Sequence, residues 1–292
     1  MPPSELIVCV GDNCVDVTQS GQRDLLNGDR ATAATPPGHM AGGNAFNVAV
    51  ALARMGRRAS YLGAVGDDPA AEVIVSAANQ AGVDTSRLER VPGSTGRTVV
   101  DHDPDGERRV VSEDYGVAAK YRIDSETAAW LAGAGWLHFA RQVDLADWGS
   151  TLREGGAVLS CDLGHGGGVG MLERVAPVVD VVFMSASSAA GLTPEQMVRR
   201  ALEAGAPLVV VTLGARGSIA ASADTHWRMD ATPVARVIDT LGAGDAYIAA
   251  FIAARMEEKR IDEAMRAGSA AGAAACTQWG PTGPITTGGV LA

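Results

Sequence analysis

Short runs of β-branched residues alternate with helical patterns along most of this 292-residue chain, and this alternation limits the fold more than any other feature. Strand–helix–strand units of this kind build a mostly parallel sheet with helices on both faces. The expected strands are residues 6–10, 59–65, 136–140, 158–162, 181–184 and 208–213. The expected helices are residues 44–55, 70–81, 124–132, 194–204, 244–258 and 262–278. The sequence therefore predicts a doubly wound α/β sandwich.

Two segments interrupt this alternation. Residues 95–112 have the pattern of a strand, an Asp-Pro-Asp-Gly turn at 103–106 and a second strand, because Pro and Gly set the dihedral angles of such turns. A hairpin inserted between two strand–helix–strand units is a candidate lid. Residues 18–40 are polar and rich in Gly, Thr and Pro, and their pattern fits either a loop or weak edge strands.

Charge and cysteine content exclude several classes of protein. Asp and Glu number 34 against 24 Lys and Arg, a formal net charge of −10 that argues against nucleic acid or an anionic membrane as partner. No apolar run reaches the roughly 18 residues of a membrane-spanning helix. The four cysteines lack C-x-x-C spacing, which argues against zinc and thioredoxin-type chemistry and favours free thiols in the cytoplasm.

The sequence Asp-Thr-Leu-Gly-Ala-Gly-Asp at residues 239–245 precedes an apolar helix. Small residues at Gly242, Ala243 and Gly244 leave backbone N–H groups open at a helix start, where the helix dipole favours an anion. A carboxylate at Asp245 makes sense there as a general base that takes the proton of a hydroxyl attacking a phosphoryl group. Ordinary helix capping by Asp245 is the alternative.

A second motif, at residues 41–49, places Gly42 and Gly43 before another helix. Asn44 and Asn47 then share one helix face, where two carboxamides suit the hydroxyls of a sugar. The alternative is that Asn44 is a simple N-cap and Asn47 is exposed.

Two further segments follow predicted strands, where open α/β sheets bind ligands. Asp12 and Asp16 are placed for a polyol or an ammonium group, or they are turn residues. Thr212, Gly214 and Gly217 could let the backbone approach a nucleotide, or they form a plain turn between strands.

Together these four segments resemble the ribokinase (PfkB) family of carbohydrate kinases over nearly the whole chain. The resemblance implies one ribokinase-like domain over residues 1–292, a three-layer αβα sandwich with a small β-sheet lid at about 14–40 and 95–116. It implies ATP as donor, with Mg²⁺ and a candidate monovalent cation. It also implies the roles of the residues: Asp245 as catalytic base; Gly242, Ala243 and Gly244 as anion hole; Thr212, Gly214 and Gly217 at the nucleotide; and Asp16, Gly42, Gly43 and Asn47 at the sugar, with Asp12 and Asn44 beside them.

Within the family, the sequence at residues 11–16, 42–50 and 237–245 is similar to that of fructosamine kinases. These enzymes phosphorylate the sugar 6-hydroxyl of an Amadori product such as fructoselysine. An acidic pocket would suit the amine of such a substrate. Another sugar or nucleoside, such as ribose or a ketohexose, is the alternative within the same chemistry. A catalytically silent sugar-binding regulator is the alternative outside it.

The chain departs from the wider family after the strand that ends near Met184, where many members carry an N-x-x-E motif associated with metal and phosphate. Residues 185–188 are Ser-Ala-Ser-Ser, so the metal ligands are unassigned. Either the metal is held through water and phosphate oxygens, or another acid such as Asp162 or Asp239 substitutes. Arg141 and His138 follow another strand and either reach the substrate or are structural, Arg141 then pairing with a helix carboxylate. An exposed lid edge also suggests a homodimer.

Overall fold

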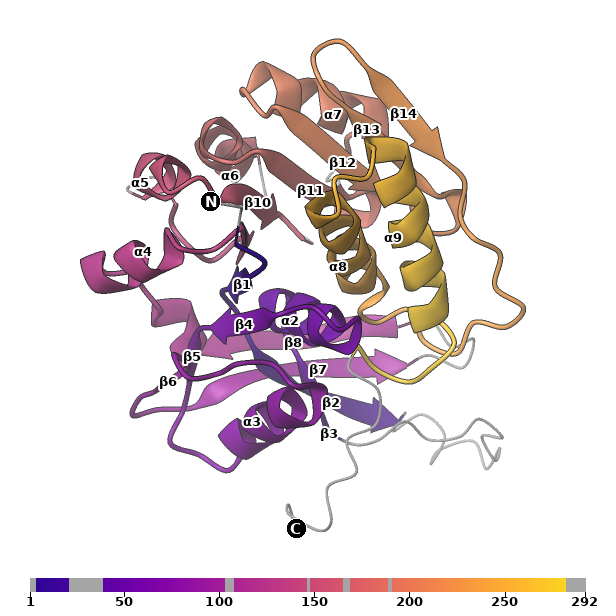
Figure 1. Ribbon diagram of the computed structural model, residues 1–292. Helices are drawn as coiled ribbons and strands as arrows, with labels where there is room; N and C mark the ends of the chain where they lie inside the picture. The colour runs from indigo at the N-terminus through magenta and orange to yellow at the C-terminus, as the bar shows by residue number, and fades with distance from the viewer. Residues whose placement is uncertain are drawn as a thin grey trace, which may run out of the picture.

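The computed structural model describes residues 4–20, 39–102, 108–145, 148–164, 169–188 and 191–281. Within these residues, eight strands form the central sheet (Figure 1). Their order is β4 (Ala59–Leu62), β1 (Ile7–Val10), β9 (Trp136–Ala140), β10 (Val158–Asp162), β11 (Val181–Ser185), β12 (Leu208–Thr212), β13 (Ser218–Ala221) and β14 (His226–Met229). The first six strands run parallel, and β13 and β14 add an antiparallel edge.

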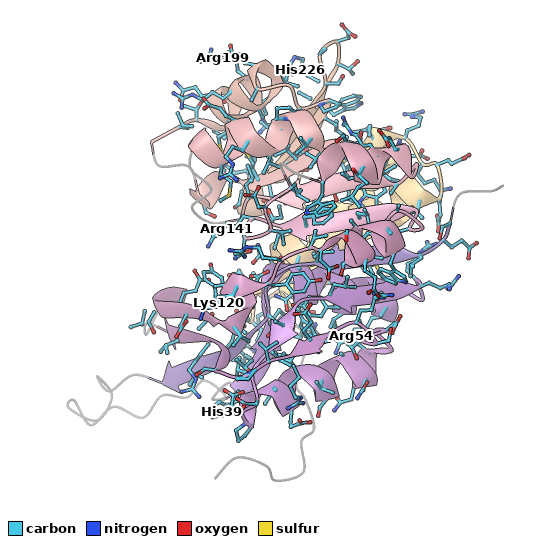
Figure 2. The ribbon with its side chains drawn as sticks, turned by 90° about the vertical axis from the view of Figure 1, so that its left-hand side faces the viewer. His39, Arg54, Lys120, Arg141, Arg199 and His226 are labelled. Atoms are coloured by element: carbon cyan, nitrogen blue, oxygen red, sulfur yellow. The ribbon has the colours of Figure 1, made fainter. Side chains whose placement is uncertain are left out.

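A second sheet contains β3 (His39–Gly42), β2 (Cys14–Ser20), β7 (Thr95–His102) and β8 (Arg108–Gly116), in that order. These strands coincide with both segments predicted to form the lid, whereas residues 21–38 and the predicted turn at 103–106 lie outside the described residues. Figure 2 shows His226 of β14 at one end of the molecule and His39 of β3 at the other. A short pair, β5 (Ala64–Val65) and β6 (Glu89–Arg90), continues from β4.

Helices cover both faces of the central sheet, as predicted. The alternation of side chains along β1 sends Ile7 and Cys9 into one hydrophobic cluster and Val8 and Val10 into the other. The first cluster packs against α2 (Asn44–Arg54), α3 (Ala70–Ala81), α8 (Ala243–Met256) and α9 (Ile261–Ala275). The second packs against α4 (Ser125–Leu131), α5 (Gly149–Glu154), α6 (Val169–Val175) and α7 (Pro194–Glu203).

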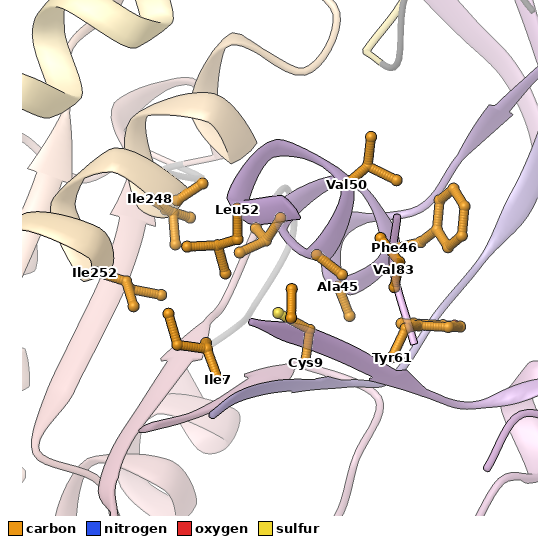
Figure 3. Packing of buried hydrophobic residues seen from close by; sticks show 14 of the residues in the cluster. Ile7, Cys9, Ala45, Phe46, Val50, Leu52, Tyr61, Val83, Ile248 and Ile252 are labelled. Atoms are coloured by element: carbon orange, nitrogen blue, oxygen red, sulfur yellow. The ribbon is translucent and has the colours of Figure 1, made fainter. Parts of the chain in front are cut away.

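Helix α8 lies between α2 and α9, and residues 247–254 of it are all buried. A helix that is apolar all round must be covered on every side. Figure 3 shows Ile248 and Ile252 facing Leu52 and Ile7. On the other side, the ring of Tyr247 lies so close to α9 that a Cβ at Gly268 would meet it at 2.9 Å. The small residues of α9 therefore serve close helix packing.

Sequence patterns misplaced some boundaries. The predicted strand 59–65 divides at Gly63, where a Cβ would clash with Tyr61 and with the carbonyl oxygen of Gly11. The hairpin β13–β14 was not predicted, and β2 and β3 fall in the predicted lid segment, whose pattern did not decide between a loop and weak strands. The four cysteines are free, as predicted, and Cys9, Cys14 and Cys161 are buried. No helix of the described residues has the length and apolarity needed to cross a bilayer.

Phe251 provides a test of the α8 packing. Its ring is fully buried and lies edge-on to Phe183, with ring centroids 5.3 Å apart. Phe251→Ala should lower the free energy of unfolding by about 3–5 kcal/mol because it leaves a cavity. Urea unfolding followed by circular dichroism measures this change, with Phe251→Leu as the control of smaller effect. A loss under about 1 kcal/mol in the alanine variant would contradict the packing described.

Candidate active site

The first turn of α2 binds a carboxylate that is distant in sequence. Asp12, immediately beyond β1, accepts hydrogen bonds from the backbone N–H groups of Asn44 (3.2 Å) and Ala45 (3.1 Å). The N-cap residue is Gly43, with φ 105°, and a Cβ there would clash with the backbone of Asn13. Asp12 therefore supplies the cap that α2 lacks locally, and its negative charge complements the helix dipole. The interpretation of Asn44 as N-cap is wrong.

The two asparagines of α2 each bind a further carboxylate. Asn44 Nδ2 donates to Asp162 Oδ2 at the end of β10, and Asn47 Nδ2 donates to Asp245 Oδ2 in α8, both at 2.7 Å. Asn47 is buried, so the interpretation that it is exposed is wrong. Its Oδ1 is buried and has no hydrogen-bond partner among the described residues. One helical turn thus joins three aspartates from three parts of the chain.

Asp245 lies in the first turn of α8, whose N-cap is Gly242 with φ 76° and no side-chain cap. The carboxylate points to Asn47 instead of the helix backbone, so the capping interpretation is wrong. Burial raises the pKa of Asp245 well above its usual range, and the negative charge of Asp162 raises it further. A carboxylate with a raised pKa is a stronger base than an exposed aspartate.

Asp16 is buried on β2, where the strand register pairs it with Met40 of β3, and its carboxylate lies against Gly42. A Cβ at Gly42 would overlap the Asp16 carboxylate, so the glycine is required by this contact. Cys14 donates through Sγ to Asp16 Oδ1 (3.4 Å) and accepts from Thr98 Oγ1 (3.3 Å). Asp16 therefore lies within a strand, and its interpretation as a turn residue is wrong.

The start of α8 is open to a ligand at Gly244, where a Cβ would meet no atom within 4 Å. The N–H of Ala243 donates to Thr240 in a turn (3.3 Å), so the three small residues do not offer equivalent amides. Asp239 accepts from Leu241 N (2.9 Å) and Gly280 N (3.0 Å). Asp239 thereby connects the glycine-rich motif at residues 239–245 to the segment around Gly280.

Thr212, Gly214 and Gly217 lie at the connection between β12 and β13, as the turn interpretation predicted. Gly214 and Gly217 have φ of 60° and 89°, values that favour glycine. Ser218, at the start of β13, lies 2.9 Å from Tyr247 OH through its Oγ. This hydrogen bond links the segment to α8 two residues beyond Asp245.

Arg141 and His138 differ in their surroundings. Arg141 hydrogen-bonds Tyr115 OH and lies 3.5 Å from Glu113 Oε2, both on β8, so its expected pairing with a helix carboxylate is wrong. His138 is fully buried, with Nδ1 2.9 Å from Ser160 Oγ, and burial lowers its pKa to about 3. Sequence patterns missed Gln142, whose Nε2 is 3.5 Å from Asp12 Oδ2, although it directly follows Arg141 at a strand end.

The fold and this constellation define a class: ribokinase-like kinases, with a glycine-rich helix start and a small sheet beside the main one. The model of the pfkB carbohydrate kinase family matches residues 4–288, so the chain belongs to that family and is a phosphotransferase.

Individual relatives and solved structures agree with this family. A fructoselysine 6-kinase of Shigella flexneri is 32% identical over 91% of this chain and 95% of its own. A fructosamine kinase of Bacillus subtilis is 30% identical over 95% of this chain and 93% of its own. The solved structure of Arabidopsis thaliana ribokinase with ribose and ATP has a TM-score of 0.81 at 24% identity, covering 97% of this chain and 96% of that one. That likeness supports the fold.

Asp162 predicts a pH dependence of stability. Burial, together with the charge of Asp12, raises its pKa from 3.8 to about 6. Because the folded state binds this proton more tightly, the contribution of Asp162 is fully present below pH 3.8 and is lost as pH rises through about 6. Asp162→Asn should therefore flatten this decline in stability, which is on the order of 1–3 kcal/mol, although the amide oxygen can accept from only one of the two donors, Gly164 N and Asn44 Nδ2.

Thermal and urea unfolding at a series of pH values would measure this effect. The exposed Asp224→Asn is the matched control and should follow the wild type. An Asp162→Asn profile parallel to the wild-type profile would show that Asp162 does not titrate as described.

Proposed function

We propose that this kinase transfers the γ-phosphoryl group of ATP to the 6-hydroxyl of a fructosamine such as fructoselysine, with Asp245 as general base. The observation that carries the proposal is the position of Asp245: partly buried, held by Asn47, and at the open start of α8. A carboxylate that is oriented by an amide and lies at an open helix start supports a role as proton acceptor.

Asp245 has one oxygen suited to proton transfer. The hydrogen bond from Asn47 reaches Oδ2, which fixes the orientation of the carboxylate. Oδ1 receives no hydrogen bond from the described residues, so it is the atom that would accept the proton of the sugar hydroxyl. Asp162 keeps the base strong because its negative charge disfavours a second anion nearby.

The sugar side of the proposed site offers mainly acceptors. Asp16, the Oδ1 atom of Asn47 and the glycine pair Gly42 and Gly43 would line it, with Asn44 and Asp12 supporting the turn from behind. Hydroxyl groups and a substituted ammonium are donors, so a polyol that carries an amine matches this lining. Both oxygens of Asp12 already accept hydrogen bonds from the first turn of α2. Asp12 would therefore attract a cationic substrate through its negative charge and not through a direct hydrogen bond.

The phosphate side would consist of residues 242–244, with the nucleotide beside Thr212, Gly214 and Gly217. Bound Mg·ATP supplies the phosphoryl group and neutralises its charge. Among the described residues no cluster of three or more His, Cys, Asp or Glu side chains forms a metal site. Mg²⁺ would then be held chiefly by phosphate oxygens and water, as it commonly is in nucleotide sites.

The names of the relatives support a fructosamine as substrate, and a kinase for ribose, a ketohexose or a nucleoside is the alternative. A catalytically silent sugar-binding protein is the less favoured alternative, motivated by Ser185–Ser188 in place of N-x-x-E. Lid movement, a homodimer through the edge strands β3 and β8, and a monovalent cation all stay predictions.

Asp245→Asn tests the proposed base. The amide cannot accept the proton, so kcat should fall by about 10²–10⁴-fold while nucleotide binding is retained. Because the substitution removes a buried charge of raised pKa, the free energy of unfolding at pH 7 should not fall. Turnover is measured with fructoselysine, fructose, ribose and adenosine, and Asp224→Asn is the control. Near-normal turnover of the Asp245 variant would exclude it as base. Turnover of only another sugar would keep the kinase and discard the fructosamine.

Gly244→Ala separates stability from phosphate binding. Alanine is the better helix former, and the site has room for Cβ, so stability should rise by a few tenths to about 1 kcal/mol. If a phosphoryl group approaches this backbone closely, kcat/KM should nevertheless fall at least tenfold. Unchanged kcat/KM in the stabilised variant would remove Gly244 from the proposed anion site.

A further inference from the structure

A cleft of about 230 Å³ lies at the carboxyl end of β9, and its lining includes Arg122, Arg141, Gln142, Asp144 and Arg174. Three guanidinium groups and one carboxylate belong to this lining. Arg174 pairs with that carboxylate, Asp144, and Arg141 lies 3.5 Å from Glu113, so the uncompensated positive charge is that of Arg122, in a chain with a net charge of −10. Figure 2 shows Arg141 at mid-height in the molecule, above Lys120. A local excess of positive charge in an acidic protein favours an anionic ligand.

Arg122 is held in place without a carboxylate. Its Nη1 donates to the carbonyl oxygens of Tyr121 (2.7 Å) and Ala119 (3.2 Å), which orient the side chain but leave its charge uncompensated. No carboxylate of the described ranges lies within ion-pair distance of it. Arg174, by contrast, pairs with Asp144 at 2.6 Å on the exposed side of the cleft.

Two adjacent residues of the cleft lining also lie near Asp12 of the proposed sugar site. Gln142 donates from Nε2 toward Asp12 (3.5 Å), and the charge of Arg141 partly offsets the rise in the pKa of Asp12 that burial causes. The Oε1 atom of Gln142 is buried and has no hydrogen-bond partner among the described residues. A donor on a ligand that passes from the sugar site into the cleft would satisfy this oxygen.

We propose that this cleft binds the carboxylate of an amino acid attached to the sugar. The substrate is then a glycated amino acid: its sugar lies at Asp245, its substituted ammonium faces Gln142 Oε1 and the charge of Asp12, and its carboxylate meets Arg122 and Arg174. This inference rests on the proposed fructosamine kinase activity and adds to it a separate site for the carboxylate of the substrate. A guanidinium fork is the group best matched to a carboxylate.

The test compares substrates that share the sugar and differ at the far end: fructoselysine, its α-carboxamide, and N-fructosyl-butylamine. Wild-type kcat/KM should be about 10- to 100-fold higher for fructoselysine than for the carboxamide, as one or two charged hydrogen bonds would give. Arg122→Met and Arg174→Met should each reduce that ratio several-fold. Arg90→Met, which removes a similarly exposed pair with Glu72 (2.6 Å), is the matched control and should leave the ratio unchanged.

The ratio of kcat/KM for fructoselysine to kcat/KM for its carboxamide reports recognition of the carboxylate alone. A variant that only weakens the fold lowers both values together and leaves their ratio unchanged. Nα-fructosyl-glycine, compared with fructoselysine linked through its ε-amine, then shows how far from the sugar the carboxylate is recognised. Equal kcat/KM for fructoselysine, its carboxamide and N-fructosyl-butylamine would overturn the inference about the cleft. The proposed fructosamine kinase activity would still hold in that case. Turnover confined to ribose, fructose or adenosine would overturn both.

Discussion

Carboxylates crowded around the first turn of α2 are the constraint on which this site depends. Asp12, Asp162 and Asp245 repel one another and lose water on burial, so each needs hydrogen-bond donors in place of that water. The turn supplies two backbone N–H groups and the carboxamides of Asn44 and Asn47. The ends of β1 and β10 and the start of α8 are thereby tied to one helix.

This arrangement keeps the site basic. An arginine in place of either asparagine would neutralise the aspartates and lower their pKa, whereas neutral amides orient them and leave their mutual repulsion in place. The buried oxygens Asn13 Oδ1, Asn47 Oδ1 and Gln142 Oε1 add further acceptors without partners among the described residues. Each unsatisfied acceptor costs about 1–3 kcal/mol, a cost that a ligand rich in donors removes.

Local signals explain what could be predicted from the sequence. The glycines before Asn44 and Asp245 mark helix starts, and the strand–helix alternation places both at one edge of the sheet, so the sequence pattern predicted that these two motifs lie close together. Contacts between distant segments have no local sequence pattern from which they could be predicted. The cap of α2 comes from Asp12, 32 positions before Asn44, and the bond between Asn44 and Asp162 spans 118 positions. Gln142 lies beside Asp12 only because β9 and β1 are neighbours.

The segment that follows α9 joins the second sheet to the glycine-rich start of α8. Gly280 packs so tightly on Met40 of β3, and Pro281 on Gly242, that a Cβ at either glycine would overlap the neighbour. Asp239 binds the N–H of Gly280 from within the motif. Residues near positions 40, 240 and 280 therefore form a single energetic unit, and the effects of substitutions there will not add. A large side chain at position 40 changes what positions 242 and 280 can accept, so sequence drift in one sheet is restrained by a loop more than 200 residues away.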